Sequence, residues 1–540
     1  MIYTSEMLES VAKVEAAREA NIALEPRRMT AEEKEALLKK YHPDYREDNF
    51  GIIKVGKNAG EKAPLELIEM LEANARVSQL EVNLDKIDYD VDVLVIGGGG
   101  AGSSAAIEAH EAGKNVMIVT KLRIGDANTM MAEGGIQAAD KPGDSPARHY
   151  IDVMGGGHYV NRPELVQKLV NDGPSAIKWL NELGVEFDKE EDGTMITTHG
   201  GGTSFKRMHA AADYSGAEIM RTLRDEVLNR EIPVVDFTAA IELIKDENGR
   251  CAGAVLMNME TGEILVARAK AVVIATGGAG RMHYQGFPTS NHYGATADGL
   301  VLAYRAGAKL LYQDTLQYHP TGVAYPNQIF GALVTEKVRS LGAKLINKDG
   351  VAFMHPLETR DVAAASIIRE CSTNGNGIMG SDGPGIWLDT PMIDMIHGAG
   401  TLEKRLPAML RMYMKYDIDM RKVPILIYPT LHYQNGGIEV NVKGETCVPG
   451  LFVAGEAIGG IHGRNRLMGN SLLDIIVFGR NAGQQTAKAV EGVELGKLTL
   501  SHVDDFAKEC EAAGIKSDLV SPKLLPTYTH GNPNREAKPF

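Results

Sequence analysis

The chain has little cysteine, no long apolar run and no excess of positive charge. Its four cysteines, among 540 residues, lie far apart and form no Cys-x-x-Cys pair. This pattern excludes an internal zinc or iron–sulfur framework and is typical of a reducing compartment. We therefore expect a cytoplasmic protein in which none of the cysteines is a metal ligand: Cys251, Cys371, Cys447 and Cys510.

The lack of a spanning apolar run and of a charged-then-apolar signal peptide predicts no direct membrane insertion. A formal net charge of −14 argues against nucleic acid and anionic membrane surfaces as partners. With 44% hydrophobic and 24% charged residues, the composition is that of a soluble globular protein. At 540 residues the chain has room for roughly three domains.

Glycine, in contrast, is abundant and gathers in the stretch VDVLVIGGGGAG, residues 91–102. Its apolar first half predicts a buried strand, and residues 103–114 predict a helix after it. Glycines at such a turn allow a tight bend and let backbone N–H groups approach a pyrophosphate at the helix N-terminus. A glycine-rich turn in another α/β protein is the alternative. The flanking strand and helix favour a dinucleotide site built on Gly97, Gly99 and Gly102.

A second strand, residues 115–120, ends where a nicotinamide dinucleotide site usually has an acidic residue for the ribose. Thr120 and Lys121 stand there instead, which weakens NAD and leaves FAD open. A further buried strand within KAVVIATGGAG, residues 270–280, opens onto glycines. It suits the close approach of a backbone to a flavin, although a plain turn would explain it if it stood alone.

Residues 1–87 precede the first strand and have the pattern of polar helices. Thr30 and Glu33 form a capping box, and a second helix is predicted by apolar residues at helical spacing, namely Leu65, Ile68, Leu71 and Ala75. Two interpretations stay open: a docking arm for a partner subunit, or a solvated extension. Further along, residues 164–183 predict a helix that is broken at Gly173-Pro174.

Five stretches place histidine, arginine or threonine in predicted loops: LQYHPTG (316–322), LVTEKVRSLGA (333–343), ETRDVAAAS (358–366), LHYQNGG (431–437) and HGRNRLMGNSLLD (462–474). A turn, a buried core or the surface explains each of these residues singly. Together they offer cations and hydrogen-bond donors for a small anion. The arginine fork matches a carboxylate bidentately, and histidine or threonine can bond the remaining oxygens.

The order of the motifs carries a resemblance. Between Asp90 and Gln484 the chain contains GGGGAG, TK, AEGGI, ATGG, HPTG, VTExxR, TRD, HYxxGG, AGE and NRLxGNSLLD. In this order they resemble the flavoprotein subunit of the succinate dehydrogenase/fumarate reductase family. The resemblance implies an α/β fold, in which a Rossmann-type FAD-binding domain is interrupted by an α+β capping domain and preceded by a helical N-terminal extension.

The implied units are the extension (1–87), the two parts of the FAD-binding domain (88–313 and 428–495), the capping domain (314–427) and a C-terminal tail (496–540). Matched motif by motif, the residues around the FAD would be Gly97, Gly99, Gly102, Thr120, Lys121, Thr129, Gly134, Gly135, Ala240, Asp298, Glu456, Ser471 and Leu472. Among these, Glu456 of AGEA would take the ribose role that Thr120 cannot fill as a carboxylate would.

For the substrate, the resemblance implies a C4 dicarboxylate, fumarate or succinate. His432 and Arg466 would hold one carboxylate, and His319 and Thr335 the other. Arg360 would be the general acid in reduction and the base in oxidation, while flavin N5 exchanges hydride with the adjacent carbon. Protons would reach Arg360 through a relay formed by Glu336 and Arg339.

Two departures from the family pattern stand out. Membrane-bound relatives attach FAD through the histidine of an S-H-T segment, but here the segment is Ala127-Asn128-Thr129, so we predict non-covalent FAD. Loss of that bond favours fumarate reduction over succinate oxidation.

Gly200 replaces the family's phenylalanine. Aspartate oxidases carry a glutamate there for the substrate amine, so glycine argues against that activity and leaves the pocket size open.

The chain has no iron–sulfur ligands of its own, so its electrons are expected from an iron–sulfur partner subunit in a cytoplasmic complex, which a partner can attach to a membrane. The leading hypothesis is a fumarate reductase. The alternatives are an L-aspartate oxidase, a reductase of another unsaturated (di)carboxylic acid, and a non-catalytic flavin scaffold for electron transfer. The last is disfavoured because the costly cationic cluster is present.

Overall fold

A computed structural model describes residues 3–380 and 382–526. Its largest sheet has 8 strands in the order β21-β10-β11-β12-β4-β5-β9, with β20 paired to β12. These strands are β4 (Tyr89–Ile96), β5 (Val116–Val119), β9 (Val234–Val235), β10 (Thr238–Asp246), β11 (Cys251–Asn258), β12 (Ile264–Ile274), β20 (Leu451–Val453) and β21 (Leu498–Thr499). Strands β5, β4, β12 and β20 pair in parallel. Their carboxyl ends therefore meet at one edge, where a ligand binds in open α/β sheets.

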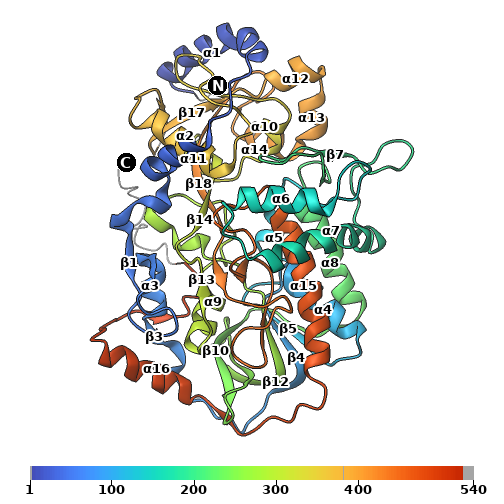
Figure 1. The fold of residues 1–540 in the computed structure, drawn as a ribbon, viewed down its shortest axis with the longest axis vertical. Helices are drawn as coiled ribbons and strands as arrows, with labels where there is room; N and C mark the ends of the chain where they lie inside the picture. Colours follow the sequence, from blue (N-terminus) through green and yellow to red (C-terminus); the bar gives the residue numbers. More distant parts are fainter. Residues whose placement is uncertain (1–2, 381, 527–540) are drawn as a thin grey trace.

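Helices pack around this sheet in the lower part of the molecule (Figure 1). There α4 (Gly100–Glu111) lies against α15 (Asn470–Ala489), which also contacts α7 (Pro163–Glu182). The other helices of this unit are α5 (Asn128–Met131), α6 (Pro146–Gly156), α8 (Ser215–Asn229), α9 (Asp298–Arg305) and α16 (Ser501–Ala512). Small sheets join β6 (Ile136–Gln137), β7 (Thr197–Thr198) and β8 (Met208–His209), and β13 (Leu310–Leu311) with β19 (Gly437–Ile438).

A second sheet has its own hydrophobic core around the fully buried Trp387 and occupies the upper part of Figure 1. It consists of β14 (Leu316–Val323), β15 (Leu345–Ile346), β16 (Ile378–Met379), β17 (Pro384–Leu388) and β18 (Ile425–Gln434). Its helices are α10 (Lys337–Ser340), α11 (Arg360–Cys371), α12 (Met392–His397), α13 (Thr401–Arg405) and α14 (Pro407–Met414). The boundaries at 314 and 427 stay a prediction, but most residues of this core lie between them.

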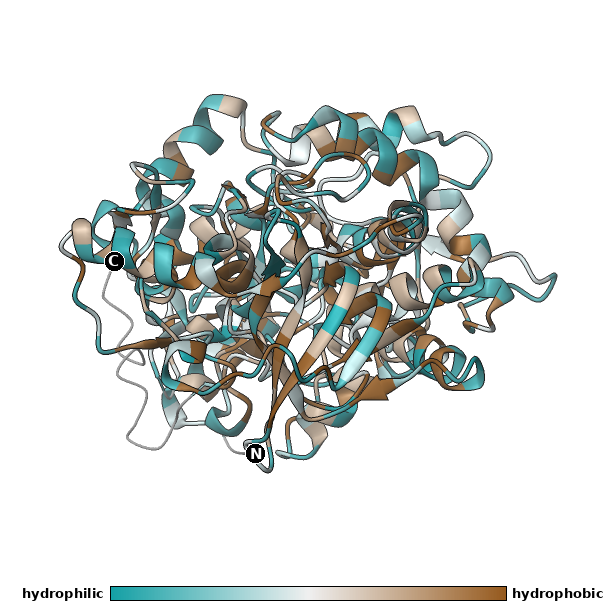
Figure 2. Cartoon of the chain, turned by 90° about the horizontal axis from the view of Figure 1, so that it is seen from below, coloured by the Kyte–Doolittle hydropathy of each residue, from teal (hydrophilic) through white to brown (hydrophobic). Residues whose placement is uncertain are grey.

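The apolar residues concentrate on the strands inside the molecule, whereas many turns of the outer helices are hydrophilic (Figure 2). This distribution is that of buried sheets with half-exposed helices. Within the described residues, we find no helix that combines the length and the apolar character needed to cross a bilayer.

The N-terminal region joins the two cores. Helix α1 (Ser5–Ala23) belongs to the second core, where Met7 and Val14 are fully buried and Trp387 Nε1 donates to Ser10 Oγ at 2.8 Å. Helices α2 (Ala31–Tyr41) and α3 (Leu65–Leu71) instead pack into the first core, and the short strands β1 (Phe50–Ile52) and β2 (Lys62–Pro64) pair between them. The interpretation as a solvated extension is therefore wrong, whereas the predicted capping box of α2 is confirmed.

Two helix predictions need correction. Helix α3 ends at Leu71, not beyond Ala75, because Asn74–Ala75 form β3 and pair with β22 (Val520–Ser521) from the other end of the chain. Helix α7 continues through Pro174 without a break. A proline removes one hydrogen bond and crowds the preceding turn. The buried face of α7 outweighs this cost through Leu165, Val166, Leu169, Val170, Ala176, Ile177 and Leu180. Of the predicted tail, residues 527–540 lie outside the described part.

Replacing Met7 by alanine should lower the free energy of unfolding by about 2–5 kcal/mol, because Met7 fills the second core and has no exposed surface. The matched control is Leu8→Ala on the same helix, since Leu8 is 42% exposed. Its effect should stay within about 0.5 kcal/mol. Urea unfolding of the full chain measures both values, and equal losses would mean that α1 is not held in this core.

Candidate active site

The glycine turn follows β4 as the sequence predicts. Gly97 has a φ of +119°, and a Cβ atom on Gly102 would lie 1.9 Å from the Gly97 carbonyl oxygen. Only glycine permits this bend and this approach of helix to strand. The N-terminus of α4 therefore faces the edge of the sheet with its first N–H groups, of which Gly100 N–H donates to Thr129 Oγ1 at 3.1 Å. Such an end attracts the phosphates of a dinucleotide.

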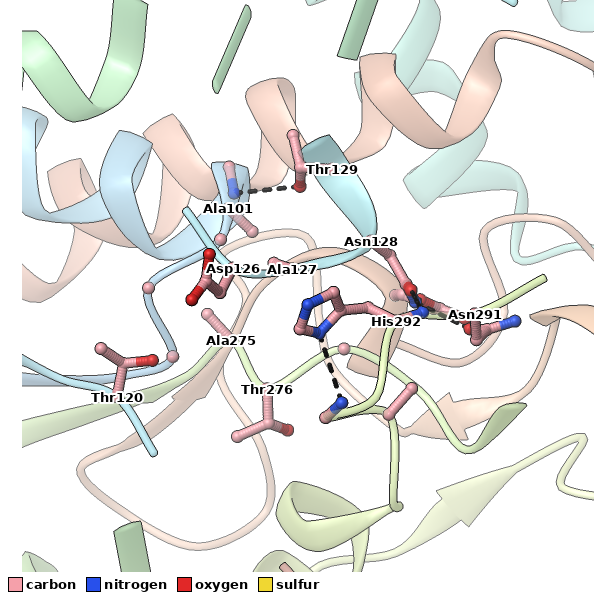
Figure 3. A pocket seen from close by; sticks show the side chains of 18 of the residues that line it. Ala101, Thr120, Asp126, Ala127, Asn128, Thr129, Ala275, Thr276, Asn291 and His292 are labelled. Atoms are coloured by element: carbon pink, nitrogen blue, oxygen red, sulfur yellow. Dashed lines mark hydrogen bonds between the residues drawn. The ribbon is translucent and has the colours of Figure 1, made fainter. Parts of the chain in front are cut away.

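A cavity of about 1340 Å³, including its mouth, follows this edge of the sheet. Its wall includes the glycine turn and the residues after the end of β5, two places that a dinucleotide contacts in this type of sheet. Most of the predicted FAD residues line it: Gly97, Gly99, Thr120, Lys121, Thr129, Ala240, Asp298, Glu456, Ser471 and Leu472. Figure 3 shows part of this wall, with Thr120, Asn128 and Thr129 among the labelled side chains. Three of the predicted residues do not line the cavity: Gly102, Gly134 and Gly135. A Cβ atom at these positions would clash with Gly97, Met468 and His209, respectively.

The two ends of the cavity can be told apart. Thr120 and Lys121 follow the end of β5, the place of the ribose in a dinucleotide fold. There Lys121 Nζ lies 2.5 Å from Asp298 Oδ2. At the other end the wall contains His432, Tyr433 and Arg466. The wall also contains the glycine turn, which can hold a pyrophosphate, so the donors of the cavity fit FAD.

Asn128, at the position of the missing histidine, is tied into the wall. Its Nδ2 donates to Asn291 Oδ1 at 2.7 Å and to Glu456 Oε2 at 3.2 Å, and its Oδ1 accepts from the His292 N–H at 2.6 Å (Figure 3). Glu456 also accepts from Gln434 N–H at 3.1 Å, and burial raises the pKa of its carboxyl. Glu456 is thus bonded beside Asn128, and its predicted ribose role stays a prediction.

The three predicted catalytic residues form one buried ion network. Arg360, the first residue of α11, places Nε 2.8 Å from Glu336 Oε2, and Arg339 Nη2 lies 3.2 Å from the same oxygen. The backbone N–H of Gly201 donates to Glu336 Oε1 at 2.7 Å. Burial alone would raise the pKa of Glu336, but Arg360 and Arg339 bring it below its usual value, so the group is a carboxylate.

Gln317 was not among the predicted site residues, although it occupies the centre of the site. Its Oε1 accepts from Arg360 Nη1 and from Arg466 Nη2, both at 2.9 Å, and its Nε2 donates to the Arg466 carbonyl at 2.7 Å. One carboxamide oxygen therefore holds two guanidinium groups side by side. A signal was present, because residues two apart on a strand share a face, and Gln317 precedes His319 by two.

His319 and His432 come from the paired strands β14 and β18, with ring centroids 5.0 Å apart. Burial, followed by the charge of Arg360, lowers the pKa of both rings well below the usual value, so both are neutral. His319 Nε2 is buried and has no hydrogen-bond partner among the described residues, whereas His432 Nδ1 lies 2.6 Å from Ser290 Oγ. Thr335, the other predicted ligand on this side, is buried.

Arg466 connects this cluster to the cavity. Its guanidinium lies 4.1 Å above the Tyr433 ring, and Nη1 donates to Ser471 Oγ at 2.8 Å. Burial and then the charge of Arg360 lower the pKa of Arg466 to about 9, which reflects a cation without a full counter-charge. Its Nε has no partner among the described residues. Arg466, His432 and Ser471 all line the cavity, so the cationic cluster and the dinucleotide site are continuous.

Comparison with known proteins agrees with this geometry. A family model described as an FAD binding domain matches residues 92–472. A chain of the CoM/CoB fumarate reductase of Methanothermobacter marburgensis is 38% identical over 74% of this chain and 73% of its own length. An L-aspartate oxidase of Streptomyces coelicolor is 36% identical over 74% of this chain and 68% of its own length.

Among solved structures, E. coli quinol fumarate reductase matches with a TM-score of 0.71 and 31% identity, over 78% of this chain and 74% of that one. Relatives named succinate dehydrogenase flavoprotein subunits match as well. The predicted fold class, the oxidoreductase class and FAD as cofactor are thereby confirmed. The chain belongs to the FAD-binding flavoprotein family of fumarate reductases and succinate dehydrogenases.

Proposed function

We propose that this flavoprotein reduces fumarate to succinate, with electrons supplied by an iron–sulfur partner subunit. The observation that carries the proposal is the charge of the cluster beside the flavin cavity. Two guanidinium groups pair with the Glu336 carboxylate, and a third is linked to them through Gln317. This set of three cations and one anion leaves two positive charges without a counter-charge inside it: Arg360, Arg339 and Arg466 with Glu336. A buried cation is costly unless it is paired. A C4 dicarboxylate brings the two negative charges that this set lacks.

The donors without partners support a position for each carboxylate. Arg466 and His432 are at the cavity, and we assign them one carboxylate of the substrate. His319, with a free Nε2, and Thr335 take the other. FAD, when bound, supplies the hydride through N5. Neutral histidines serve here as hydrogen-bond donors, because protonation beside Arg360 is unfavourable.

In this proposal Arg360 gives a proton to the substrate carbon that does not receive the hydride. An arginine is a weak acid for this task, because its pKa is poorly matched to neutral pH. Placement compensates, since Arg360 is held by Glu336 and Gln317 and need not reorganise. The ion pairs of Glu336 with Arg360 and Arg339 give a short path for reprotonation. The excess positive charge also stabilises the negative charge that develops on the substrate.

The iron–sulfur partner is proposed from the cysteine pattern, because the four cysteines are separated in sequence and form no cluster motif. Relatives named as flavoprotein subunits support a multi-subunit complex. Gly200 argues against the aspartate oxidase alternative. Glycine provides no carboxylate at this position to pair with a substrate ammonium group.

The purified, FAD-loaded chain should oxidise reduced viologen only when fumarate is added, because the dye replaces the electron-donating partner. Absorbance of the reduced dye measures the rate. Aspartate with oxygen should give no peroxide. Peroxide formation with aspartate, in the absence of fumarate turnover, would assign the chain to the oxidases. No turnover with either compound would leave a reductase of another unsaturated acid or the electron-transfer scaffold.

Substituting Arg360 by glutamine or lysine should lower fumarate reduction by at least about 10²–10⁴-fold, because the proton donor is lost. FAD should stay bound, as Arg360 is not in the wall of its cavity. The control is Arg421→Gln, which removes a half-exposed arginine paired with Asp419 in the second unit. Steady-state rates and the flavin absorbance of each variant test this. Activity of the Arg360 variants within about threefold of wild type would exclude it as the acid.

FAD should leave the denatured polypeptide completely, because asparagine at position 128 provides no imidazole for a covalent bond. Precipitation with acid, followed by absorbance of the supernatant, measures the released fraction. As a positive control, a relative with the S-H-T segment should keep its yellow colour in the pellet. Flavin that stays with this chain after precipitation would show a covalent bond at another residue.

A further inference from the structure

The last described segment of the chain returns to the FAD cavity after helix α16. Strand β22 pairs in parallel with β3, and Asn74 N–H donates to the Leu519 carbonyl at 3.0 Å. Arg76 Nη2 donates to the Pro522 carbonyl at 3.0 Å, and the buried Arg305 donates to Ser521 Oγ at 2.5 Å. Two arginines and a strand pair thus fix residues 519–522 on the first unit.

Beyond this anchor, Leu524 is bonded to residues of the cavity wall. Its carbonyl accepts from Lys121 Nζ at 2.5 Å and from Thr296 Oγ1 at 3.0 Å. Its N–H donates to Asp298 Oδ1 at 3.0 Å. The ion pair of Lys121 and Asp298 therefore binds both main-chain groups of Leu524. Tyr293 adds a further contact by donating its hydroxyl to the Pro526 carbonyl at 3.0 Å.

The backbone of Leu524 is in the left-handed region, with a φ of +67°. A leucine there has a strained backbone and persists where the surroundings fix it. Glycine would avoid this cost, but it would lack the side chain, which is 3% exposed and packs into a small core with Val77 and Ala239. Leu524 also lines the cavity itself. Glycine would relieve the strain, so the contacts of the buried side chain account for leucine at this position.

The part of the cavity beside Leu524 is the adenosine end. Leu524 is bonded to Lys121, which follows the end of β5, where a dinucleotide places its ribose. The Asp298 side chain belongs to the same end. The family model matches residues 92–472, so this segment lies outside the matched region.

We propose that residues 523–526, here called the strap, are part of the FAD site and that residues 519–522 only anchor them. Leu524 covers the adenosine end, and its carbonyl positions the Lys121 ammonium group beside Asp298. FAD enters or leaves at this end when the strap lifts. This proposal depends on FAD as the cofactor and not on fumarate as the substrate. A failure of the strap proposal would therefore leave the proposed fumarate reduction intact, and the reverse also holds.

The test compares Leu524→Ala with Leu519→Ala in the full-length, FAD-loaded protein. Leu519 lies in the same segment but is 43% exposed, so it serves as the matched control. We expect Leu524→Ala to release FAD about tenfold faster on dilution, as judged by the rise of flavin fluorescence, and to purify with less flavin per chain. Leu519→Ala should match the wild type in both measurements.

A second variant, Tyr293→Phe, removes the hydrogen bond to the outer end of the strap. Tyr293 is 39% exposed, so the fold should tolerate the change. Loss of its hydrogen bond to Pro526 should speed FAD release by about two- to tenfold. Thermal unfolding with excess FAD separates a site defect from a folding defect, because added FAD restores the midpoint only when the site is intact but weaker.

Three results would overturn the proposal. The first is that Leu524→Ala releases FAD at the rate of Leu519→Ala and purifies with the same flavin content. The second is that added FAD does not restore its unfolding midpoint. The third is that Tyr293→Phe leaves the release rate unchanged while Leu524→Ala raises it. Leu524 would then retain FAD through its own contacts, and lifting of the strap would not control release.

Discussion

The hydrogen bonds that place two guanidinium groups on one carboxamide oxygen are the constraint on which the site depends. Arg360 and Arg466 approach Gln317 Oε1 from different units, and both are buried. Two like charges this close repel each other, and the lowered pKa of Arg466 reflects burial and this repulsion. Gln317 is neutral, so it positions the cations without satisfying them. A glutamate at 317 would neutralise the very charge that attracts an anion.

This arrangement requires that the second unit be held firmly over the first, because a displacement of about 1 Å in the position of a catalytic group can cost much of its effect. The chain provides this hold from its N-terminal region. Helix α1 is packed in the second core, whereas α2 and α3 are packed in the first. Met29, which precedes α2, donates its N–H to Glu358 at 3.2 Å, and Lys34 of α2 pairs with Glu358 at 2.8 Å. Glu358 lies two residues before Arg360, so the N-terminal region anchors the loop that leads into α11 and the proposed acid.

Local features of the sequence were sufficient for the strand, the glycine turn and the capping box, because sterics and hydrogen bonding over a few residues decide them. Gln317 was missed for a different reason. Its role arises only when β14 and α11 bring it to Arg360, and its position two residues before His319 was the one signal in the sequence. Helix α7 shows the same limit, since its contacts with α15 compensate for Pro174. The ends of α3 and the path of the strap depend on pairing between β3 and β22, which are separated by most of the chain.

Asn128 and the strap both affect how firmly the protein retains FAD, each at a different end of the cofactor. A covalent bond would make cofactor loss negligible whatever the rest of the site contributes. The predicted lack of a covalent bond at Asn128 leaves retention to non-covalent contacts, and the Asn128 carboxamide is bonded to Glu456 and to the 291–292 segment. Each added contact slows release exponentially, because the free energy of binding enters the rate constant as an exponent. The slower FAD release that Leu524 provides at the adenosine end then offsets the free-energy cost of its strained backbone. The enclosure at Leu524 supplies part of the retention that a bond at position 128 would otherwise provide.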